Sequence, residues 1–495
     1  MKKFLRFFSS GLFFIVLALA IEVLIVLFFD FNGDQLLSTI LALNNVDNPD
    51  FTLVIGILEI VFGVIRFIAT IFAIVIFFKV INKFEDPEFK IPWLIFLFIF
   101  PVVTVTFFII FADHGLPKKE KKLMDEYYKQ ISPFFDEHDK EIRLRELGNA
   151  AGAFEYINNT AHVGYHKNNR VTYYKTGEEF FPAFIEGLKK AKKFIFIEFF
   201  IVTDGTYWGE VQDVLKQKAQ EGVDVRVIYD DLGCLGTISS RTPKKLRKFG
   251  IKCYKFHPFR PLLSAVFNNR DHRKIVVIDH QMAFTGGINL ADEYGNLIER
   301  FGYWKDTMVK IEGSAIGNLI STFMANYALA CKKVEDLSKF LEHDYKEYED
   351  EGFVMPFGDG PGGIDDALIG EQNYINLLNY AKKEVFISTP YLIPTYSLVD
   401  ALRNAAMRGV KVHLILPGIP DKKMVYKVAK SHFKPLLKAG VNIYLYTPGF
   451  NHMKTMLSDD ALAFVGTINY DFRSLVHHFE CGYKRHCGKK TNNRM

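Results

Sequence analysis

The sequence predicts an α/β protein in which N-terminal transmembrane helices precede two similar α/β domains related by pseudo-twofold symmetry. Three observations lead to this fold class. The first 115 residues contain long apolar runs, and from about residue 150 short β-branched runs alternate with helical stretches. The alternation then repeats at a nearly constant offset. Apolar runs of this length can cross a bilayer, and alternating strand and helix patterns are typical of a largely parallel sheet.

Composition supports a membrane part joined to a soluble part. The chain has 495 residues, more than one hydrophobic core usually organises, and 49% of them are hydrophobic while 24% are charged. The net charge of +5 is too small for a dedicated nucleic-acid binder and fits a charged lipid surface better. Five scattered cysteines lack zinc-ligand spacing, so we expect no disulfide framework, no metal site and a reducing compartment.

Residues 1–115 are predicted to form a transmembrane region of about three spans. The runs at 11–29 and 91–112 are long enough to cross roughly 30 Å of hydrocarbon as helices. The stretch at 53–80 carries Glu59 and Arg66, so its span is expected nearer its C-terminal half, unless these charges face a neighbouring helix. The first run lacks a small-residue cleavage site, which favours a span over a signal peptide.

Basic residues flank the first and the last predicted spans and leave the topology open. They are Lys2, Lys3 and Arg6 before the first span, and Lys118, Lys119, Lys121 and Lys122 after the last. Three spans cannot place both groups in the cytoplasm. Both would lie there if the first segment lay in the membrane interface or the second were re-entrant. We expect a multi-pass protein of the cell membrane whose soluble domains are cytoplasmic.

An internal repeat divides the soluble part into two domains. The run AKKFIFI at 191–197 matches AKKEVFI at 381–387, GVDV at 222–225 matches GVKV at 409–412, and LRKFGI at 246–251 matches LLKAGV at 436–441. Each match joins a helix end, a turn and a strand, and three matches in one order exceed what any two α/β domains share by chance. We therefore predict a linker at 116–150, a first domain at 151–335 and a second at 336–495.

A paired motif is the most informative part of the repeat. Each copy has a histidine, a lysine two residues later and an aspartate five residues after that, followed by a glycine and an asparagine. The members are His272, Lys274, Asp279, Gly286 and Asn289 in the first copy, and His452, Lys454, Asp459, Gly466 and Asn469 in the second. One such match arises by chance often enough to mean little, whereas two in register do not.

The residue types predict phosphodiester chemistry. Period-two strand geometry places each histidine and lysine on one face, so two imidazoles, two ammonium groups and two carboxamides would surround a tetrahedral anion. Lys274, Asn289, Lys454 and Asn469 are the expected phosphate ligands. One histidine would attack phosphorus and form a phosphohistidine while the other protonates the leaving alkoxide. No cofactor is expected, because lysines supply the charge that metal ions provide elsewhere.

The two aspartates complete the candidate catalytic set as supporting residues. Asp279 and Asp459 follow a short strand-like run in each motif. Carboxylates at strand ends more often brace a turn than transfer protons.

These motifs resemble the phospholipase D superfamily, in which two such motifs from two similar domains form one active site. The runs NRDHRKIVVIDHQMAFTGGINLADEY and HMKTMLSDDALAFVGTINYDFRSLVHHFE resemble the cardiolipin synthases in particular, as do YYKTGEEFF, EGVDVRVIYDDLG and ISTPYLIP. The similarity extends over nearly the whole chain, including DPEFKIPWL between the last two spans.

The resemblance implies a phosphatidyl transferase that joins two phosphatidylglycerol molecules and releases glycerol and cardiolipin. It implies partners in phosphatidylglycerol, other anionic phospholipids and the bilayer, and no nucleic acid. His272 would be the nucleophile and His452 the acid and base, an assignment that near-equivalent halves make reversible. Glu293 and Glu480 match positions where superfamily members carry a carboxylate that orients a histidine.

The C-terminus departs from the family's pattern. Only 26 residues follow Asn469, and their basic, Asn-rich end lacks the apolar strand and helix that the repeat predicts there. We therefore hypothesise a truncated or frame-shifted C-terminus. Such an end would leave the core of the second domain incomplete.

Two other readings of the same residues stay open. A phospholipase D or a membrane-tethered nuclease would use identical groups with water as acceptor. A non-catalytic membrane protein with a vestigial site belongs to a different class, and it is disfavoured because both His-Lys-Asn sets are complete.

Overall fold

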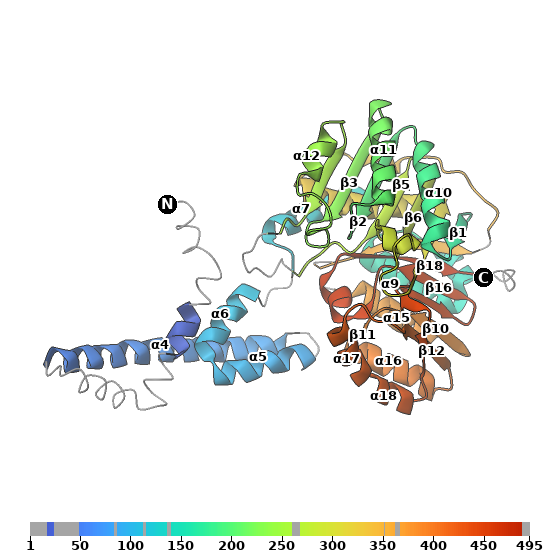
Figure 1. The fold of residues 1–495 in the computed structure, drawn as a ribbon. Coiled ribbons are helices and arrows are strands. Elements are labelled where there is room, and N and C mark those ends of the chain that lie inside the picture. The colour runs from blue at the N-terminus through green and yellow to red at the C-terminus, as the bar shows by residue number, and fades with distance from the viewer. Residues whose placement is uncertain are drawn as a thin grey trace. The chain divides into compact units, whose positions relative to one another are not determined.

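The structure, a computed structural model, describes residues 17–23, 49–83, 87–111, 115–135, 140–259, 268–350, 352–361 and 367–487. These residues form two compact units, one before residue 112 and one from residue 115 onward (Figure 1). Each unit has its own hydrophobic clusters.

The first unit is built around the long apolar helix α4, Pro49–Asn82. Within the described residues, only Ile60–Asn82 is both long and apolar enough to cross a membrane as one helix. Its large apolar side chains point outward, as Phe67 does with 67% of its surface exposed. The candidate span begins directly after Glu59, towards the C-terminal side of the predicted 53–80 stretch.

The predicted span at 91–112 is divided into two shorter helices, α5, Pro87–Ile99, and α6, Pro101–Phe111. Pro101 has no N–H to donate to the preceding turn, which interrupts the helical hydrogen bonding at this point. Both helices contact α4. The expectation of one uninterrupted helix is therefore wrong here. Of the predicted 11–29 span, residues 17–23 are helical, and the rest lies outside the described residues.

Residues 116–150, predicted to be a linker, instead form part of the second unit. They contain α7, Lys118–Ile131, and α8, Lys140–Leu147, and α9 follows at Ala151–Ala161. On α7, Tyr127 is almost completely buried and donates a 2.5 Å hydrogen bond to the carbonyl of Ser321. The amphipathic pattern of α7, whose buried face carries Met124, Tyr127 and Ile131, explains why this segment packs.

Two seven-stranded sheets with the same topology confirm the predicted pair of similar α/β halves. The first has the order β1-β8-β6-β5-β2-β3-β4 and the second β9-β18-β16-β15-β10-β12-β13. The first comprises β1 Arg170–Tyr174, β2 Phe194–Phe199, β3 Asp224–Asp230, β4 Lys252–Phe256, β5 Lys274–Ile278, β6 Met282–Gly286 and β8 Met308–Glu312. The second comprises β9 Phe353–Asp359, β10 Glu384–Ser388, β12 Lys411–Pro417, β13 Asn442–Tyr446, β15 Thr455–Ser458, β16 Leu462–Gly466 and β18 Glu480–His486.

The sheets are mixed, and the prediction of largely parallel sheets is wrong. In each half the three strands at one edge are parallel, as β2, β3 and β4 are, while the remaining pairs are antiparallel. The same holds for the second sheet. The antiparallel part arises because β5 and β6, like β15 and β16, are joined by a tight turn rather than by a crossover helix.

Helices cover these sheets and fill the space around them (Figure 1). The first half contributes α10 Gly177–Lys189, α11 Thr206–Gln220, α12 Thr242–Arg247, α13 Ile316–Cys331 and α14 Ser338–Leu341. The second half contributes α15 Ile369–Tyr380, α16 Tyr396–Met407, α17 Lys423–Ser431 and α18 Phe433–Lys438. Two short parallel pairs complete the unit: β7 Tyr303–Lys305 with β14 Gly449–Asn451, and β11 Leu392–Ile393 with β17 Tyr470–Asp471.

The basic C-terminal segment forms a strand, contrary to expectation. β18 pairs with β16 on one side and β9 on the other, so residues 480–486 lie inside the second sheet. Lys484 is buried there, donates a 2.9 Å hydrogen bond to the carbonyl of Ala153 and lies over the Phe154 ring. Burial lowers the pKa of Lys484 to about 7, which reduces the cost of placing an amine in the core. Residues 488–495 lie outside the described part.

The two halves differ at one sheet face. In the first half, α13 covers Phe196 and Tyr254, with Phe323 stacked on Phe196 at 4.8 Å and Tyr327 against Tyr254 at 5.6 Å. The equivalent strand positions of the second half hold Phe386 and Tyr444, and His413 lies on the strand between them. Phe386 and Tyr444 are 40% and 49% exposed, and among the described residues no helix follows β18 to cover them.

This difference predicts unequal costs for two matched substitutions. We expect Phe196→Ala to lower the free energy of unfolding by about 3–5 kcal/mol, because it empties a closed core site. Phe386→Ala should cost less than about 1 kcal/mol, because its ring is already partly hydrated. Urea unfolding of the detergent-solubilised protein measures both. Equal losses of unfolding free energy would contradict the difference in burial between Phe196 and Phe386.

Candidate active site

The second unit brings the two predicted motifs to one place between its two sheets. His272 lies just before β5 and His452 just before β15, and the side chains of both are almost completely buried. The backbone of each histidine is held by the other half. The His272 N–H donates to the Phe479 carbonyl at 2.8 Å, and the His452 N–H donates to the Lys305 carbonyl at 2.8 Å.

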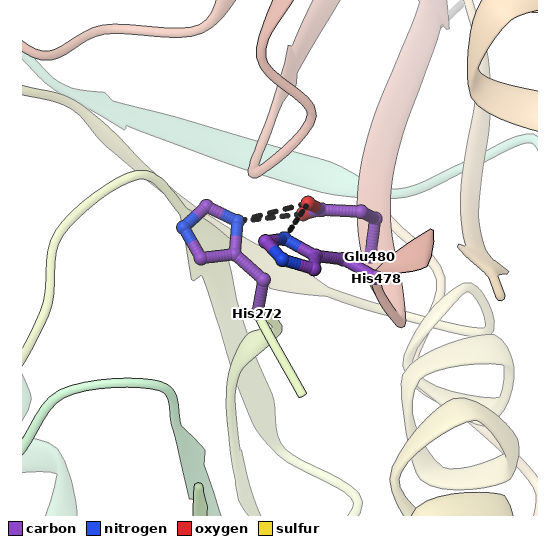
Figure 2. A group of neighbouring side chains, drawn as sticks. All are labelled: His272, His478 and Glu480. Atoms are coloured by element: carbon purple, nitrogen blue, oxygen red, sulfur yellow. Dashed lines mark hydrogen bonds and ion pairs between the residues drawn. The ribbon is translucent and has the colours of Figure 1, made fainter. Parts of the chain in front are cut away.

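The His272 ring is oriented by Glu480 of the other half (Figure 2). Its Nδ1 lies 2.9 and 3.0 Å from the two carboxylate oxygens. Glu480 also accepts hydrogen bonds from the hydroxyls of Thr467 and Ser474. Burial opposes ionisation of Glu480, but its interactions with the His272 and His478 rings lower its pKa, so the group is a carboxylate at neutral pH.

The His452 ring is oriented by Asp306 of the first half. Its Nδ1 lies 2.6 Å from Asp306 Oδ2, and the Thr307 N–H donates to Asp306 Oδ1 at 2.8 Å. Burial raises the pKa of Asp306 to about 6, against the effect of the Lys454 ammonium. Asp306 remains ionised near pH 7 and holds the imidazole as Glu480 does on the other side.

Sequence reasoning missed Asp306 and selected Glu293 in its place. Glu293 accepts a 2.8 Å hydrogen bond from Arg300, and in the described part of the chain it makes no hydrogen bond to either histidine. The signal that relates Asp306 to Glu480 is the register of the strands. Each acid lies two residues before the residue that pairs with the motif glycine. Gly286 pairs with Met308, and Gly466 pairs with Gly482.

Carboxylates at Nδ1 leave Nε2 of each ring available for chemistry. An Nδ1–H that donates to a carboxylate fixes the tautomer with a lone pair on Nε2. Burial lowers the pKa of His272 and His452 well below the usual value, so both rings are neutral before an anion binds. Neutral Nε2 is the form that attacks phosphorus.

The two motif lysines supply buried positive charge beside the rings. Lys274 Nζ donates to the His272 carbonyl at 2.6 Å, and Lys454 Nζ lies 2.8 Å from His452 Nδ1. Burial lowers the pKa of Lys274 to about 8 and that of Lys454 to about 7. The Lys274 charge also lowers the pKa values of His452 and Lys454. The two ammonium groups therefore act on one shared site, and a bound anion would restore their protonation.

The motif asparagines are buried but differ in their contacts. Asn289 accepts a hydrogen bond from the Ile201 N–H at 3.0 Å and donates to the Tyr294 hydroxyl at 2.6 Å. The Asn469 N–H donates to Ser474 Oγ at 2.9 Å, and its buried Oδ1 has no hydrogen-bond partner. Asn289 thus positions Tyr294, whose ring lies 5.4 Å from the His452 ring.

The motif aspartates are structural. Asp279 accepts hydrogen bonds of 2.8 Å from the N–H groups of residues 192–194, and Asp459 accepts bonds of 2.6–2.9 Å from those of residues 382–384. Both adopt positive φ at the strand ends, at 50° and 52°. These contacts agree with the turn-bracing role that was expected of them.

The motif glycines let the acid-bearing strands approach. A Cβ on Gly286 would lie 2.5 Å from the carbonyl oxygen of Thr307, and one on Gly466 would lie 2.6 Å from that of Cys481. Thr307 and Cys481 directly follow Asp306 and Glu480. The glycines are needed because each orienting carboxylate is carried by the neighbouring strand.

A third histidine, His478, lies beside the His272 and Glu480 pair and was missed by the sequence analysis (Figure 2). Its Nδ1 is 3.4 Å from Glu480, and its ring centre is 5.4 Å from that of His272. The ligand atoms of these three residues lie within 4.8 Å of one another, a spacing that a metal ion could use. Glu480 already accepts bonds from His272, Thr467 and Ser474, which fits a carboxylate that orients an imidazole.

Comparison with known proteins identifies the family. A family model described as "Cardiolipin synthase, PLD-like domain" matches residues 184–299 and 374–486. A cardiolipin synthase 2 of Bacillus anthracis is 33% identical over 80% of this chain and 77% of its own length. This chain belongs to the cardiolipin synthase family.

Two further proteins are similar to this chain. An uncharacterized protein of Streptococcus mutans is 43% identical over 81% of this chain and 87% of its own. The crystal structure of phosphatidylserine synthase from Haemophilus influenzae matches with a TM-score of 0.51 and 16% identity, covering 69% of this chain and 87% of that one. At that identity the match supports the fold alone.

The reciprocal carboxylates predict a specific pattern of losses. We expect Glu480→Gln and Asp306→Asn each to lower kcat by about 10²–10⁴-fold, because an amide no longer favours the tautomer with Nε2 free. Glu293→Gln should retain turnover, since Glu293 contacts Arg300 rather than a histidine. Initial rates of product formation from phosphatidylglycerol in detergent micelles check this. A larger loss in Glu293→Gln than in Asp306→Asn would refute the assignment.

Proposed function

We propose that this protein is a phosphatidyltransferase that joins two phosphatidylglycerol molecules into cardiolipin and glycerol. Membership of the cardiolipin synthase family supports the substrate class and the reaction. The observation that carries the proposal is the reciprocal pair of buried imidazole–carboxylate contacts, with two buried lysines beside them. This arrangement matches the needs of double displacement at one phosphorus.

In the first step, Nε2 of His272 attacks the phosphorus of one phosphatidylglycerol. The bond from phosphorus to the glycerol oxygen breaks, and His452, which takes up a proton at Nε2 as the anionic lipid binds, gives that proton to the departing alkoxide. Glycerol leaves, and a phosphatidyl-histidine remains. Lys274 and Lys454 stabilise the charge that develops on the phosphoryl oxygens.

In the second step, His452 removes a proton from a glycerol hydroxyl of a second phosphatidylglycerol. The alkoxide attacks phosphorus, the bond between phosphorus and nitrogen breaks, and cardiolipin forms. His272 is assigned as the nucleophile from its match to the family's motif, and the equivalent carboxylate behind each ring makes the assignment reversible.

We also propose that the enzyme is a multi-pass protein of the cell membrane with its catalytic unit in the cytoplasm. The long apolar α4 and the family assignment support membrane attachment. The basic run at 118–122 supports a cytoplasmic position for the catalytic unit. Cys234, Cys253, Cys331 and Cys481 are free thiols, which suits a reducing compartment.

A product assay tests the reaction. Labelled phosphatidylglycerol incubated with the purified protein should yield cardiolipin and glycerol in equal amounts. Phosphatidic acid as the main product would instead identify a hydrolase, and degradation of DNA a nuclease. Absence of turnover under conditions that support a family member would favour a non-catalytic protein.

Trapping the covalent intermediate tests the roles of the histidines. We expect His452→Ala to form an acid-labile phosphatidyl-protein adduct slowly after addition of labelled lipid and to retain it, because transfer of the phosphatidyl group to the second lipid lacks its base at His452. His272→Ala should form no adduct, and turnover should fall by at least about 10³-fold in both. Intact-protein mass spectrometry measures the adduct. The opposite pattern would exchange the roles of the two histidines.

A further inference from the structure

The second half carries a basic, partly apolar surface that the reaction itself does not use. Residues 419–438 comprise α17, α18 and the turns around them, and they contain six lysines and one aspartate. Four large apolar side chains in the same segment are exposed: Ile419 at 43%, Met424 at 72%, Val428 at 48% and Leu437 at 53%. We call residues 419–438 the α17 surface.

On α17 the apolar and charged residues are arranged as in helices that lie in a membrane interface. Met424 and Val428 are one turn apart and form an exposed apolar stripe, and Lys423, Lys427 and Lys430 are exposed beside it. The buried side of the helix is provided by Ala429. Such a helix inserts apolar side chains between lipids while its lysines remain among anionic headgroups.

The α17 surface begins at the active site. Asp421, two residues before α17, accepts a 2.6 Å hydrogen bond from Tyr391, and Lys422 lies over the Tyr391 ring at 5.0 Å. The Lys422 charge contributes to the lowered pKa of His452. The Ile419 N–H donates to the carbonyl of Gly449, which lies in the strand that leads to His452.

The first half extends the apolar rim at the same place. A Cβ on Gly302 would lie 3.2 Å from Cδ1 of Ile419, so the loop that ends there touches the α17 surface. That loop exposes Leu297 and Ile298, at 52% and 56%. Apolar side chains from both halves therefore border the site.

We propose that the α17 surface docks the catalytic unit onto an anionic bilayer, with the active site facing the headgroups. This inference rests on the proposed function, which requires a phosphodiester that is held in a membrane. Charge complementarity identifies the partner as a surface of anionic phospholipid rather than a neutral one. Docking at the mouth of the site brings the phosphorus of a bilayer lipid to His272 without full extraction of its acyl chains.

Fluorescent probes at two matched methionines test the docking. Met424 and Met407 are equally exposed at 72%, but Met424 follows the C-terminal end of β12 whereas Met407, on α16, precedes its N-terminal end. In a Cys331→Ser background, M424C and M407C each carry an environment-sensitive label on the full chain in nanodiscs. The bilayers are phosphatidylcholine alone or an equal mixture with phosphatidylglycerol, with and without a lipid-borne quencher.

We expect the label at 424 to shift to the blue and to be quenched in the mixed bilayer, less so in phosphatidylcholine, while the label at 407 stays in water. Equal behaviour of the two labels, or insertion at 424 that does not depend on phosphatidylglycerol, would overturn the proposal. The signal requires no turnover. Cardiolipin formed while the label at 424 remains in water would therefore overturn the docking and leave the proposed function intact.

Charge reversal gives a second, kinetic test with a matched control. The triple change Lys423→Glu, Lys427→Glu and Lys430→Glu should raise KM for phosphatidylglycerol in bilayers more than about tenfold, because each lysine contributes severalfold to binding of an anionic surface. Turnover of a short-chain, monomeric phosphatidylglycerol should not change. The control variant changes three exposed lysines of the first half, Lys244, Lys245 and Lys248, to glutamate. Equal effects of the two triple variants would contradict a specific docking surface.

Discussion

The catalytic unit depends on two hydrogen bonds that cross between its halves. Glu480 holds His272 and Asp306 holds His452, so neither half contains a complete site. These two contacts fix the relative position of the two halves closely, because an imidazole that shifts by more than a few tenths of an ångström loses its bond to the carboxylate. Backbone bonds from His272 to Phe479 and from His452 to Lys305 reinforce the same contacts. The pseudo-twofold arrangement is thus a consequence of how each ring is oriented.

The same geometry sets the electrostatics of the site. Two lysines and two carboxylates are buried beside the neutral rings, and burial is the largest cause of the lowered pKa values of the lysines and of the raised pKa of Asp306. A phosphodiester adds one negative charge where Lys274 and Lys454 act together. Binding therefore offsets part of the cost of burying the lysines, and the site favours an anion of tetrahedral shape over a neutral ligand.

The residues that sequence could identify were those with a local pattern. The spacing of His272, Lys274 and Asn289 recurs at His452, Lys454 and Asn469, and the structure brings these residues together. Asp306 has no such pattern, because a longer loop in the first half shifts its offset from Glu480 to 174 residues rather than 180. Only the strand register relates the two acids.

Fold predictions failed where composition gave the wrong signal about packing. The segment at 480–486 is rich in basic residues, yet it forms an inner strand of the second sheet. Lys484 donates a hydrogen bond to the Ala153 carbonyl and lies over an aromatic ring, and the side chains that alternate with it pack in the core. The helix at 118–131 lies in the segment predicted to be a linker. Its composition is dominated by lysines, but its buried stripe has helical spacing. In both cases a few buried positions decided the structure over the average character of the segment.

The symmetry of the chemistry contrasts with an asymmetry around it. Between β3 and α12 the first half has only a compact turn, whereas between β12 and α18 the second half inserts α17 with its lysines. The reaction needs equivalent groups on both sides of one phosphorus, which explains why the strands, glycines and acids are repeated. A bilayer presents itself from one side only, so a surface that faces it has no reason to be repeated. The segment that leads into α17 carries Lys422, whose charge acts on His452, and this placement agrees with a site that receives both lipids from one membrane face.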